Sequence, residues 1–327
     1  MISLVFVLEA NLAKRHLTEQ QQTRIADQQK LHSDHAANTA QIVAHYGREV
    51  DIEQNNQIIR CRLRQSMPSL VVGDWVSWQP EAHDTGVVTA LTPRQTTLKR
   101  SDSRGQTKLV AANLDQVMIT LSVEPSFTAF LLDSYIAAIE LCDLTPIIVL
   151  NKTDLLTDEL EAAIDALLLP YQNLGYQLIL THTQDTKGLA SLKAALIDHV
   201  SVFIGQSGVG KSSLIQQLLP NEAIAVGHIS SQQKLGRHTT TTSRLYHLPS
   251  GGDMIDSPGV REFGLGRVSA ADCFHAFVEF RPFKGCCKFR DCTHRHEPDC
   301  AILNALKDNH ISESRLNSFY KLAEPNL

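Results

Sequence analysis

The sequence predicts a multidomain α/β protein in three folded parts. Short alternating apolar runs separated by Gly and Pro fill residues 42–112, as in a small β-barrel or sandwich. Strand-like and helix-like runs alternate over residues 113–262, which is typical of βαβ units and a mostly parallel sheet. Four of the seven cysteines fall within residues 286–300, which indicates a metal-binding region, followed here by helices.

Composition excludes several classes of protein. Of the 327 residues, 43% are hydrophobic and 20% are charged, unlike a disordered or fibrous chain. The net charge of -5 excludes a chain that is basic throughout. Residues 1–112 nevertheless carry 13 basic and 11 acidic residues, whereas the remainder carries 17 basic and 24 acidic residues. A local basic surface is therefore compatible with the sequence.

The N-terminal region predicts neither an export signal nor a folded core. The apolar run at residues 2–8 is shorter than the ~20 residues that cross a bilayer, and no positive stretch precedes it. An odd number of cysteines without an export signal indicates reduced thiols. We expect a cytoplasmic protein with no membrane attachment and a flexible N-terminal arm over residues 1–40.

Within the first folded part, the apolar alternation predicts strands at residues 41–45, 57–63, 75–79 and 86–91. A basic stretch follows, which we interpret either as a solvated loop or as a loop that contacts nucleic acid. This stretch contains one acid, Asp102, and five cations, which are Arg94, Lys99, Arg100, Arg104 and Lys108.

The predicted elements of the second and third parts follow from apolar periodicity. We expect strands at 116–123, 147–150, 177–181 and 201–204. We expect helices at 130–142, 158–169 (ending at Pro170), 189–199, 211–219, 300–308 and 312–323.

Residues 205–212 match the phosphate-binding pattern GxxxxGK[ST] between a predicted strand and a predicted helix. Glycines let backbone N–H groups wrap the phosphates, and the helix start adds its dipole. Lys211 can reach the β- and γ-phosphates and stabilise the transferring phosphoryl charge, and the Ser212 hydroxyl can ligate Mg²⁺. The predicted phosphate loop comprises Gly205, Gln206, Ser207, Gly208, Val209, Gly210, Lys211, Ser212 and Ser213.

A second motif selects the base. Asn151, Lys152, Thr153 and Asp154 form an NKxD tetrapeptide after a predicted strand. The Asp154 carboxylate can accept hydrogen bonds from guanine N1–H and the 2-amino group, whereas adenine would leave it unpaired. The stretch 181–183 is either a base-supporting loop or an ordinary polar loop.

The γ-phosphate side of the site is predicted from residues 236–260. Asp256 and Gly259 form DxxG, which places a carboxylate near Mg²⁺ and an N–H at the γ-phosphate. In the preceding Thr-rich stretch, Thr241 is the leading candidate Mg²⁺ ligand and Thr240 the next. Val260 cannot orient water where Ras-like enzymes use Gln, so His238 is the candidate catalytic residue. The alternative is that His238 is an ordinary loop histidine.

The motif order is NKxD, phosphate loop, Thr loop, DxxG, which is a circular permutation of the ordinary GTPase order. Nearby domain termini allow such a rearrangement without loss of the sheet. DxxG then leads directly into the Cys/His region, so we hypothesise that a γ-phosphate-dependent movement reaches that region.

The spacing Cys287-x4-Cys292-x-His294-x5-Cys300 supplies three thiolates and one imidazole, which suit tetrahedral Zn²⁺. Four protein ligands leave no position for a reactive water, so we expect one structural zinc. Cys286 and His296 are neighbouring competitors. Cations around the cluster could contact RNA phosphates, but nearby acids offset them.

Together these motifs resemble the circularly permuted small-ribosomal-subunit biogenesis GTPases of the RsgA/YjeQ family. The matching stretches are 69–74, 147–152, 205–213, 236–241, 256–264 and 287–300. The resemblance implies an OB-fold RNA-binding domain at 41–112, a permuted GTPase domain at 113–262 with its motifs in the order G4-G5-G1-G2-G3, and a zinc-binding domain at 263–327. The apolar start departs from the family's basic arm.

The resemblance also implies a function. The chain would bind GTP with Mg²⁺, bind 16S rRNA on the 30S subunit late in maturation, and hydrolyse GTP to GDP and phosphate when the subunit stimulates it, coupled to release. The resemblance also implies that His238 assists hydrolysis and that the zinc ligands are Cys287, Cys292, His294 and Cys300. We expect a monomer with no DNA or membrane partner.

Two alternatives stay open from the residues. One is an RNA-binding assembly factor whose nucleotide site acts only as a switch. Intact nucleotide binding without subunit-stimulated phosphate release would favour this alternative. The other is a zinc hydrolase with a regulatory phosphate loop, which an open coordination position would favour.

Overall fold

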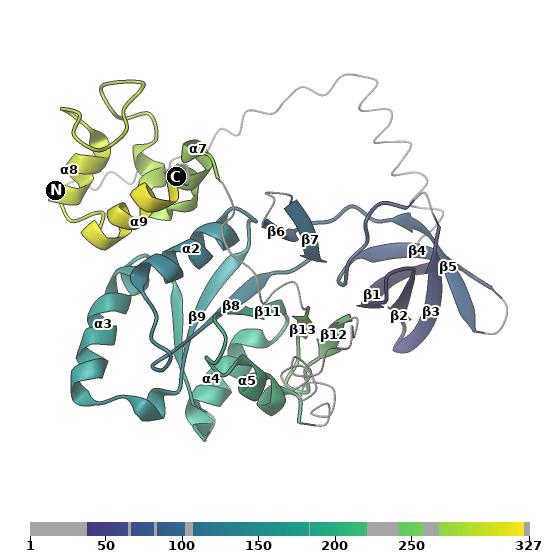
Figure 1. Ribbon diagram of the computed structural model, residues 1–327. Helices are drawn as coiled ribbons and strands as arrows, with labels where there is room; N and C mark the ends of the chain where they lie inside the picture. Colours follow the sequence, from purple (N-terminus) through teal and green to yellow (C-terminus); the bar gives the residue numbers. More distant parts are fainter. Residues whose placement is uncertain are drawn as a thin grey trace, which may run out of the picture. The chain divides into compact units, whose positions relative to one another are not determined.

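The computed structural model describes residues 38–64, 67–81, 84–101, 107–182, 184–220, 242–257 and 268–323. The stretch from Ala40 onward forms one compact unit (Figure 1). The predicted arm at residues 1–40 lies almost entirely outside the described residues. Among the helices described, none has the length and apolar character needed to span a membrane.

The first part is a closed five-stranded barrel. Its strand order is β1-β2-β3-β5-β4, and β4 also pairs with β1, which is the closure of an OB-fold. Ile42, Ile52, Val76 and Val88 are fully buried inside it, so the barrel interpretation is confirmed over the sandwich. The strands are β1 (Thr39–His45), β2 (Glu49–Gln54), β3 (Gln57–Leu63), β4 (Trp75–Pro80) and β5 (Thr85–Leu91).

The basic stretch that we expected to be a loop is largely strand. β6 (Thr97–Ser101) and β7 (Thr107–Ala112) pair antiparallel. Leu98 of β6 and the consecutive apolar residues Val110, Ala111 and Ala112 of β7 are buried. Arg94 is structural: its Nε donates to Asp74 Oδ1 at 2.6 Å and its Nη2 to Asp74 Oδ2 at 2.8 Å. Asp74 is fully buried, so Arg94 compensates an internal charge.

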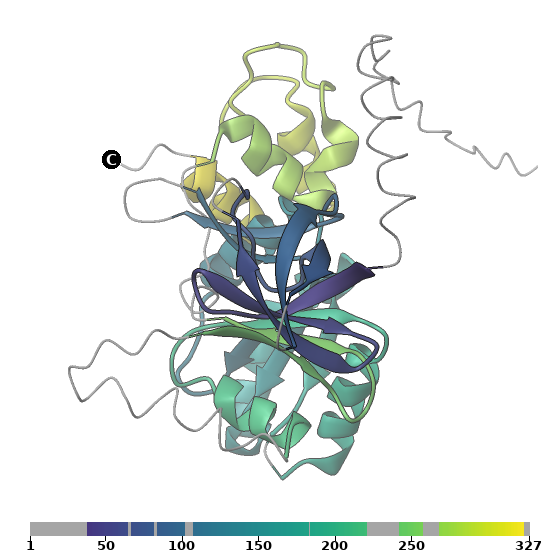
Figure 2. The ribbon, with the colours of Figure 1, turned by 90° about the vertical axis from the view of Figure 1, so that its right-hand side faces the viewer.

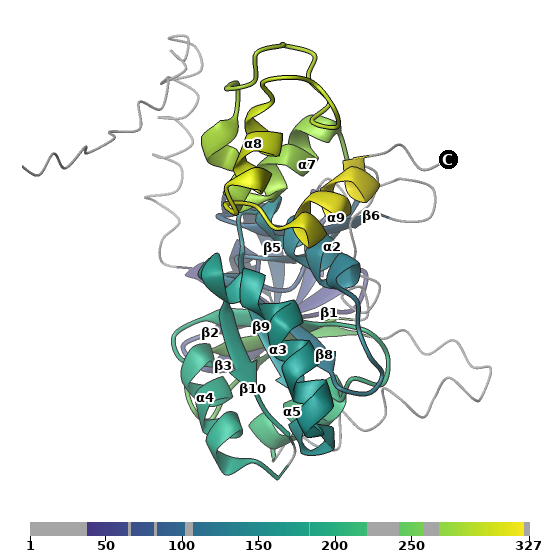
Figure 3. The ribbon, with the colours of Figure 1, turned by 90° about the vertical axis from the view of Figure 1, so that its left-hand side faces the viewer.

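The second part is a sheet with helices on both faces (Figure 3). Strands β10-β9-β8-β11-β13 run parallel, and β12 joins β13 antiparallel. Residues of α2 and α3 bury against one face and residues of α4 and α5 against the other. The elements are β8 (Gln116–Ser122), α2 (Ala129–Glu140), β9 (Thr145–Asn151), α3 (Asp158–Asn173), β10 (Gln177–Leu180), α4 (Thr186–Leu196), β11 (Val200–Ile204), α5 (Lys211–Leu218), β12 (Ser243–His247) and β13 (Asp253–Asp256).

The prediction that α3 ends at Pro170 is wrong, because Pro170 lies inside the helix. A proline in the last turn removes one N–H donor, and packing can outweigh that loss. Tyr171, just after it, is 1% exposed, and its hydroxyl donates to Asp133 Oδ1 of α2 at 2.7 Å. This contact with α2 holds the final turn in place.

The barrel and the sheet are joined by β12. Ala44 and His45 of β1 pair antiparallel with Arg244 and Ser243 of β12, so the strands run continuously from one part into the other (Figures 1 and 2). His247 adds a side-chain bridge: its Nδ1 lies 2.6 Å from Asp253 Oδ1 and its Nε2 lies 2.6 Å from Glu53 Oε2 on β2.

The third part packs on α2 (Figure 3). Its anchor is Arg315, which donates to Asp133 Oδ1 at 2.7 Å and to both Glu279 oxygens at 2.7 and 2.9 Å. The elements of this part are α7 (Ala270–Ala276), the 3-10 helix η5 (Val278–Phe283), α8 (Ala301–Lys307) and α9 (Glu313–Ala323). Sequence periodicity did not predict α7.

Replacing Arg315 by Ala is expected to destabilise the protein by about 3–5 kcal/mol, because it leaves two buried carboxylates without their cation. The Arg315, Asp133 and Glu279 side chains are only 2%, 0% and 4% exposed. Urea unfolding measures the change. The matched control is Arg281→Ala, whose ion pair with Glu140 is 37% exposed on the arginine side and is worth about 1 kcal/mol or less. Equal losses in the two variants would contradict the buried anchor.

The His247 bridge is expected to weaken as pH rises. Burial opposes the imidazolium charge, but the hydrogen bonds to Glu53 and Asp253 outweigh it and raise the pKa of His247. A raised folded-state pKa contributes stability that is present below the unfolded value of 6.5 and is lost above the folded value. The measurement is the difference in unfolding free energy between wild type and His247→Gln. That difference should shrink from pH 6 to pH 8, and a difference that grows would contradict the bridge.

Candidate functional site

The three predicted nucleotide motifs lie at one edge of the parallel sheet. Asn151 ends β9, Gly205 follows β11 and Asp256 ends β13. Carboxyl ends of parallel strands share an edge, which is where open α/β sheets bind ligands. The permuted chain therefore brings its separated motifs together, because β8 lies between β9 and β11 while β13 flanks β11.

Two glycines of the phosphate loop occupy space that no side chain can share. A Cβ at Gly205, where φ is +138°, would lie 2.1 Å from the Thr120 carbonyl oxygen. A Cβ at Gly210, where φ is +92°, would lie 2.2 Å from Asn151 Nδ2. The loop is thus pressed against β8 on one side and the NKxD motif on the other, which fixes its path over the sheet edge.

A buried hydrogen bond joins the base motif to the phosphate loop. Asn151 Nδ2 donates to the Val209 carbonyl at 2.9 Å. Lys152, held at φ 59°, donates from Nζ to the Glu124 carbonyl at 2.6 Å, which stretches its chain across the site. Asp154 is exposed in the 3-10 helix η2 (Thr153–Leu155), where its carboxylate can meet a base edge.

The base-motif turn also contacts the loop after β10. The Thr153 amide donates to the Thr181 carbonyl at 3.3 Å, so residue 181 supports the motif that we expect to hold guanine. Thr183 lies outside the described residues, so the prediction of a base-supporting loop is untested.

Lys211 and the two serines after it open helix α5. The Lys211 ammonium donates to the carbonyls of Gly205 at 2.7 Å and Gln206 at 2.6 Å, which holds it over its own loop. Ser212 and Ser213 are exposed in the first turn, where hydroxyls and backbone N–H groups are available to an anion and its metal.

On the γ-phosphate side, the structure describes Asp256 but not its predicted partners. Asp256 ends β13 beside the phosphate-loop strand β11, so its carboxylate and the Ser212 hydroxyl suit the oxygen ligands that Mg²⁺ prefers. His238, Thr240, Thr241, Gly259 and Val260 lie outside the described residues, and their roles remain predictions.

The four predicted zinc ligands converge. His294 Nδ1 lies 3.5 Å from Cys287 Sγ, 3.5 Å from Cys292 Sγ and 3.4 Å from Cys300 Sγ. Cys287 Sγ lies 3.9 Å from Cys300 Sγ, and all four ligand atoms fall within 4.8 Å of one another. Tetrahedral zinc with ordinary bond lengths sets S···N near ~3.5 Å and S···S near ~3.8 Å. The donor set therefore fits zinc, and Cys286 is exposed and outside the cluster.

Glu297 organises the segment that carries the four zinc ligands, residues 287–300, which we call the ligand loop. The sequence patterns did not assign this role to Glu297. Its carboxylate accepts hydrogen bonds from the backbone amides of Thr293 at 2.8 Å, Arg295 at 3.0 Å and His296 at 3.2 Å. The hydrogen bond from the Thr293 hydroxyl, followed by those from the backbone amides, holds the pKa of Glu297 well below its usual range. Only the Thr-x3-Glu spacing could have suggested this arrangement.

Gly210→Ala is expected to weaken GTP binding at least tenfold. The added Cβ would displace the buried Asn151 amide and break its bond to Val209, in addition to the cost of about 1–2 kcal/mol for a non-glycine residue in the left-handed region. Equilibrium binding of a fluorescent GTP analogue measures the effect. Gly175→Ala is the control, because Gly175 has φ +86° but nothing within 4 Å of the added Cβ. Similar binding losses in both variants would show that backbone strain alone matters.

Cys300→Ala is expected to abolish binding of one equivalent of zinc and to destabilise the third part, since Cys300 is 1% exposed in its core. Metal content after exhaustive dialysis, with Cys286→Ala as the control, checks the assignment. Retention of stoichiometric zinc by the Cys300 variant, or its loss from the Cys286 variant, would contradict it.

Comparison with known proteins agrees with this arrangement. The family model described as RsgA GTPase matches residues 91–266. A protein of Azotobacter vinelandii named small ribosomal subunit biogenesis GTPase RsgA is 43% identical, with 94% of this chain and 96% of that protein covered. A protein of Pseudomonas aeruginosa with the same name is 44% identical at the same coverage.

Solved structures show the same architecture. YjeQ from Thermotoga maritima is 28% identical with a TM-score of 0.72, covering 88% of this chain and 99% of that one. YloQ, described as a circularly permuted GTPase, is 27% identical with a TM-score of 0.69, covering 89% and 97%. The permuted motif order, the shared sheet edge and these relatives lead to one conclusion: the chain belongs to the RsgA GTPase family and is a GTP hydrolase.

Proposed function

We propose that this GTPase acts on the small ribosomal subunit late in its maturation, binding its 16S rRNA in the GTP state and leaving after hydrolysis. The observation that carries the nucleotide part is the Asn151–Val209 hydrogen bond, which joins a guanine-reading motif to a phosphate loop. The ribosomal part is supported by the names of the relatives at more than 40% identity.

The proposed binding mode uses the sheet edge described above. Asp154 accepts from guanine N1–H and the 2-amino group, while residues 205–213 wrap the phosphates. Bound Mg²⁺ would neutralise charge on the β- and γ-phosphates, and Ser212, Thr241 and Asp256 would hold it. Lys211 would exchange its two loop carbonyls for phosphate oxygens, and Gly259 would donate its N–H to the γ-phosphate.

Hydrolysis transfers the γ-phosphoryl group to water and leaves GDP and inorganic phosphate. Valine at position 260 can neither donate nor accept a hydrogen bond, so we propose that His238 orients the attacking water. We propose that docking on the subunit places His238 for this role, so that turnover without the subunit is slow.

Zinc is proposed as a structural ion of the third part. The donor atoms Cys287 Sγ, Cys292 Sγ, His294 Nδ1 and Cys300 Sγ would fill all four positions of a tetrahedron. Bound zinc would cross-link the ligand loop to the start of α8, which is what a small region with a limited core requires. The closed ligand set disfavours a zinc hydrolase.

We propose RNA contacts for the barrel and for the zinc region, with functional units at 41–112, 113–262 and 263–327 in a cytoplasmic monomer. The barrel's exposed β3 cations already have acidic partners: Arg60 pairs with Asp51, and Arg62 with Glu81 at 2.6 Å. Exposed Trp75 and Ile58 offer its stacking and apolar surface.

The direct test is phosphate release from GTP with and without 30S subunits, for wild type and His238→Ala. We expect strong stimulation of wild type and a loss of stimulation in the variant of about 10²-fold or more, typical of a positioned acid–base group. Absence of stimulation with intact GTP binding would favour an assembly factor that only switches. Equal stimulation of both proteins would remove His238 from the mechanism.

A further inference from the structure

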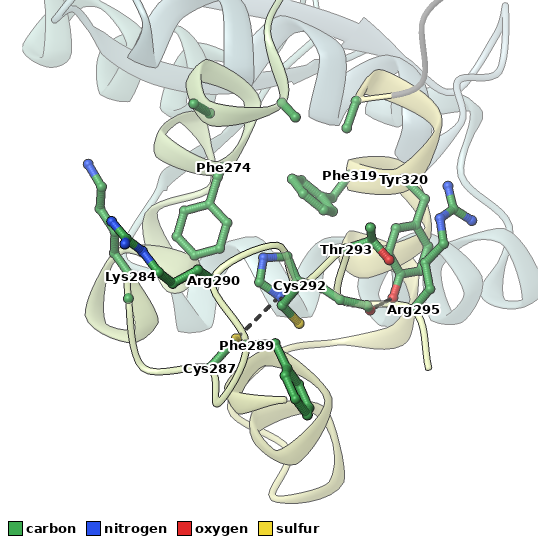
Figure 4. A pocket seen from close by; sticks show the side chains of 15 residues that line it. Phe274, Lys284, Cys287, Phe289, Arg290, Cys292, Thr293, Arg295, Phe319 and Tyr320 are labelled. Carbon is green, nitrogen blue, oxygen red and sulfur yellow. Dashed lines mark hydrogen bonds between the residues drawn. The ribbon is translucent and has the colours of Figure 1, made fainter. Parts of the chain in front are cut away.

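Beside the metal cluster lies a cavity of about 740 Å³ that the proposed GTPase chemistry does not use. Its walls come from α7, the ligand loop and α9 (Figure 4). Cys287, Cys292 and His294 form part of the wall, so a metal bound there would close that side and leave the remainder open. The volume is ample for a single nucleotide or a short side-chain cluster.

The remaining walls are rich in aromatic side chains. Phe274 comes from α7, Phe319 and Tyr320 from α9, and Phe289 from the ligand loop. Phe274 and Phe319 pack edge to face with centroids 6.3 Å apart, while Phe289 is 42% exposed. Exposed aromatic rings at a cavity mouth are the surfaces on which unstacked bases lie.

The rim of this cavity is cationic. Lys284 and Arg290 extend together on one side, and Arg295 lies on the other (Figure 4). The lining residues that the structure describes include no Asp or Glu. Two other cations of this region form ion pairs, since Arg281 donates to Glu140 at 2.7 Å and Lys288 to Asp299 at 2.7 Å. Arg295 also has a partner, because its guanidinium lies 4.6 Å from the centroid of the Tyr320 ring.

Two nearby carboxylates, those of Glu297 and Asp299, do not line the cavity. Glu297 accepts from the backbone of its own loop, and Asp299 accepts from Lys288. The lining itself therefore carries three cations and no acid, although Asp291 follows Arg290 in the sequence and the whole chain carries -5. Positive rim charge beside an aromatic wall complements a phosphodiester chain with one base turned out.

We propose that this cavity binds one unstacked nucleotide of single-stranded RNA, with its base against Phe289 and its phosphates on Lys284 and Arg290. The proposal rests on the proposed function and deepens it, since it gives the zinc region a defined RNA contact. Phe289, Arg290 and Arg295 all sit in the ligand loop, so metal binding would organise the contact.

The test uses the full-length zinc-loaded protein and a fluorescent single-stranded RNA decamer of repeated adenosine-cytidine, which cannot pair with itself. Phe289→Ala is expected to weaken binding roughly 5- to 150-fold, as removal of one stacking partner does, without changing the salt dependence. The control is Phe130→Ala, an exposed phenylalanine of α2 away from the cavity lining.

The phosphate-binding cations have a separate readout. Lys284→Ala/Arg290→Ala is expected to reduce the slope of log affinity against log salt by about 1.4, or about 0.7 for each phosphate that is no longer neutralised. Lys307→Ala/Lys321→Ala removes two cations of the same region that do not line the cavity and should leave the slope unchanged. Zinc content and unstimulated GTP hydrolysis of every variant should equal those of wild type.

Wild-type decamer affinity and salt slope in both cavity variants would overturn the proposal. So would cavity variants that bind the decamer normally but lose binding of a poly-glutamate peptide, because the occupant would then be an acidic peptide. The ribosomal function and the RNA pocket can fail separately. If 30S subunits fail to stimulate hydrolysis while the decamer results hold, the ribosomal function fails and the RNA pocket stands.

Discussion

The nucleotide site depends on one buried hydrogen bond, from the Asn151 side-chain amide to the Val209 carbonyl. The two residues lie 58 positions apart in the chain, on neighbouring segments of the same sheet edge. Gly210 permits the contact, because a Cβ at this position would lie 2.2 Å from Asn151 Nδ2. With this bond in place, a buried contact between a side chain and the backbone fixes the distance between the base-reading and the phosphate-wrapping groups, which is the preorganisation that specific binding needs.

The permutation changes what is attached to the site rather than the site itself. The barrel precedes the sheet and pairs with β12 through Ala44 and Arg244. That strand lies between the predicted Thr loop and Asp256, so backbone hydrogen bonds connect the barrel to the segment between the two proposed γ-phosphate contacts. Arg315 fastens the third part to α2. Both outer parts are thus held to the GTPase sheet by specific polar contacts.

Sequence patterns predicted the barrel, the parallel sheet and the convergence of Cys287, Cys292, His294 and Cys300, because glycine spacing, apolar periodicity and ligand spacing are local. What failed depended on distant partners. The stretch around Arg94 was interpreted as a basic loop, because nothing in the local sequence reveals that the Arg94 guanidinium neutralises buried Asp74. Pro170 was predicted to end its helix, because the sequence does not show the contact between Tyr171 and Asp133, which joins two helices distant in the chain and compensates for the hydrogen bond that the proline removes. The weak alternation of β2 and the short α7 were missed for the same reason: tertiary packing, rather than propensity, forms them.

The central claim is that the edge formed by β9 and β11 binds a guanine nucleotide through Asp154. The most direct measurement is the affinity of Asp154→Ala for GTP and for ATP, with Thr153→Ala as the neighbouring control. Loss of two hydrogen bonds to a carboxylate should lower GTP affinity by about a hundredfold or more and leave the weak ATP affinity unchanged. Unchanged preference for GTP, or an equal loss for both nucleotides, would contradict this account of the site.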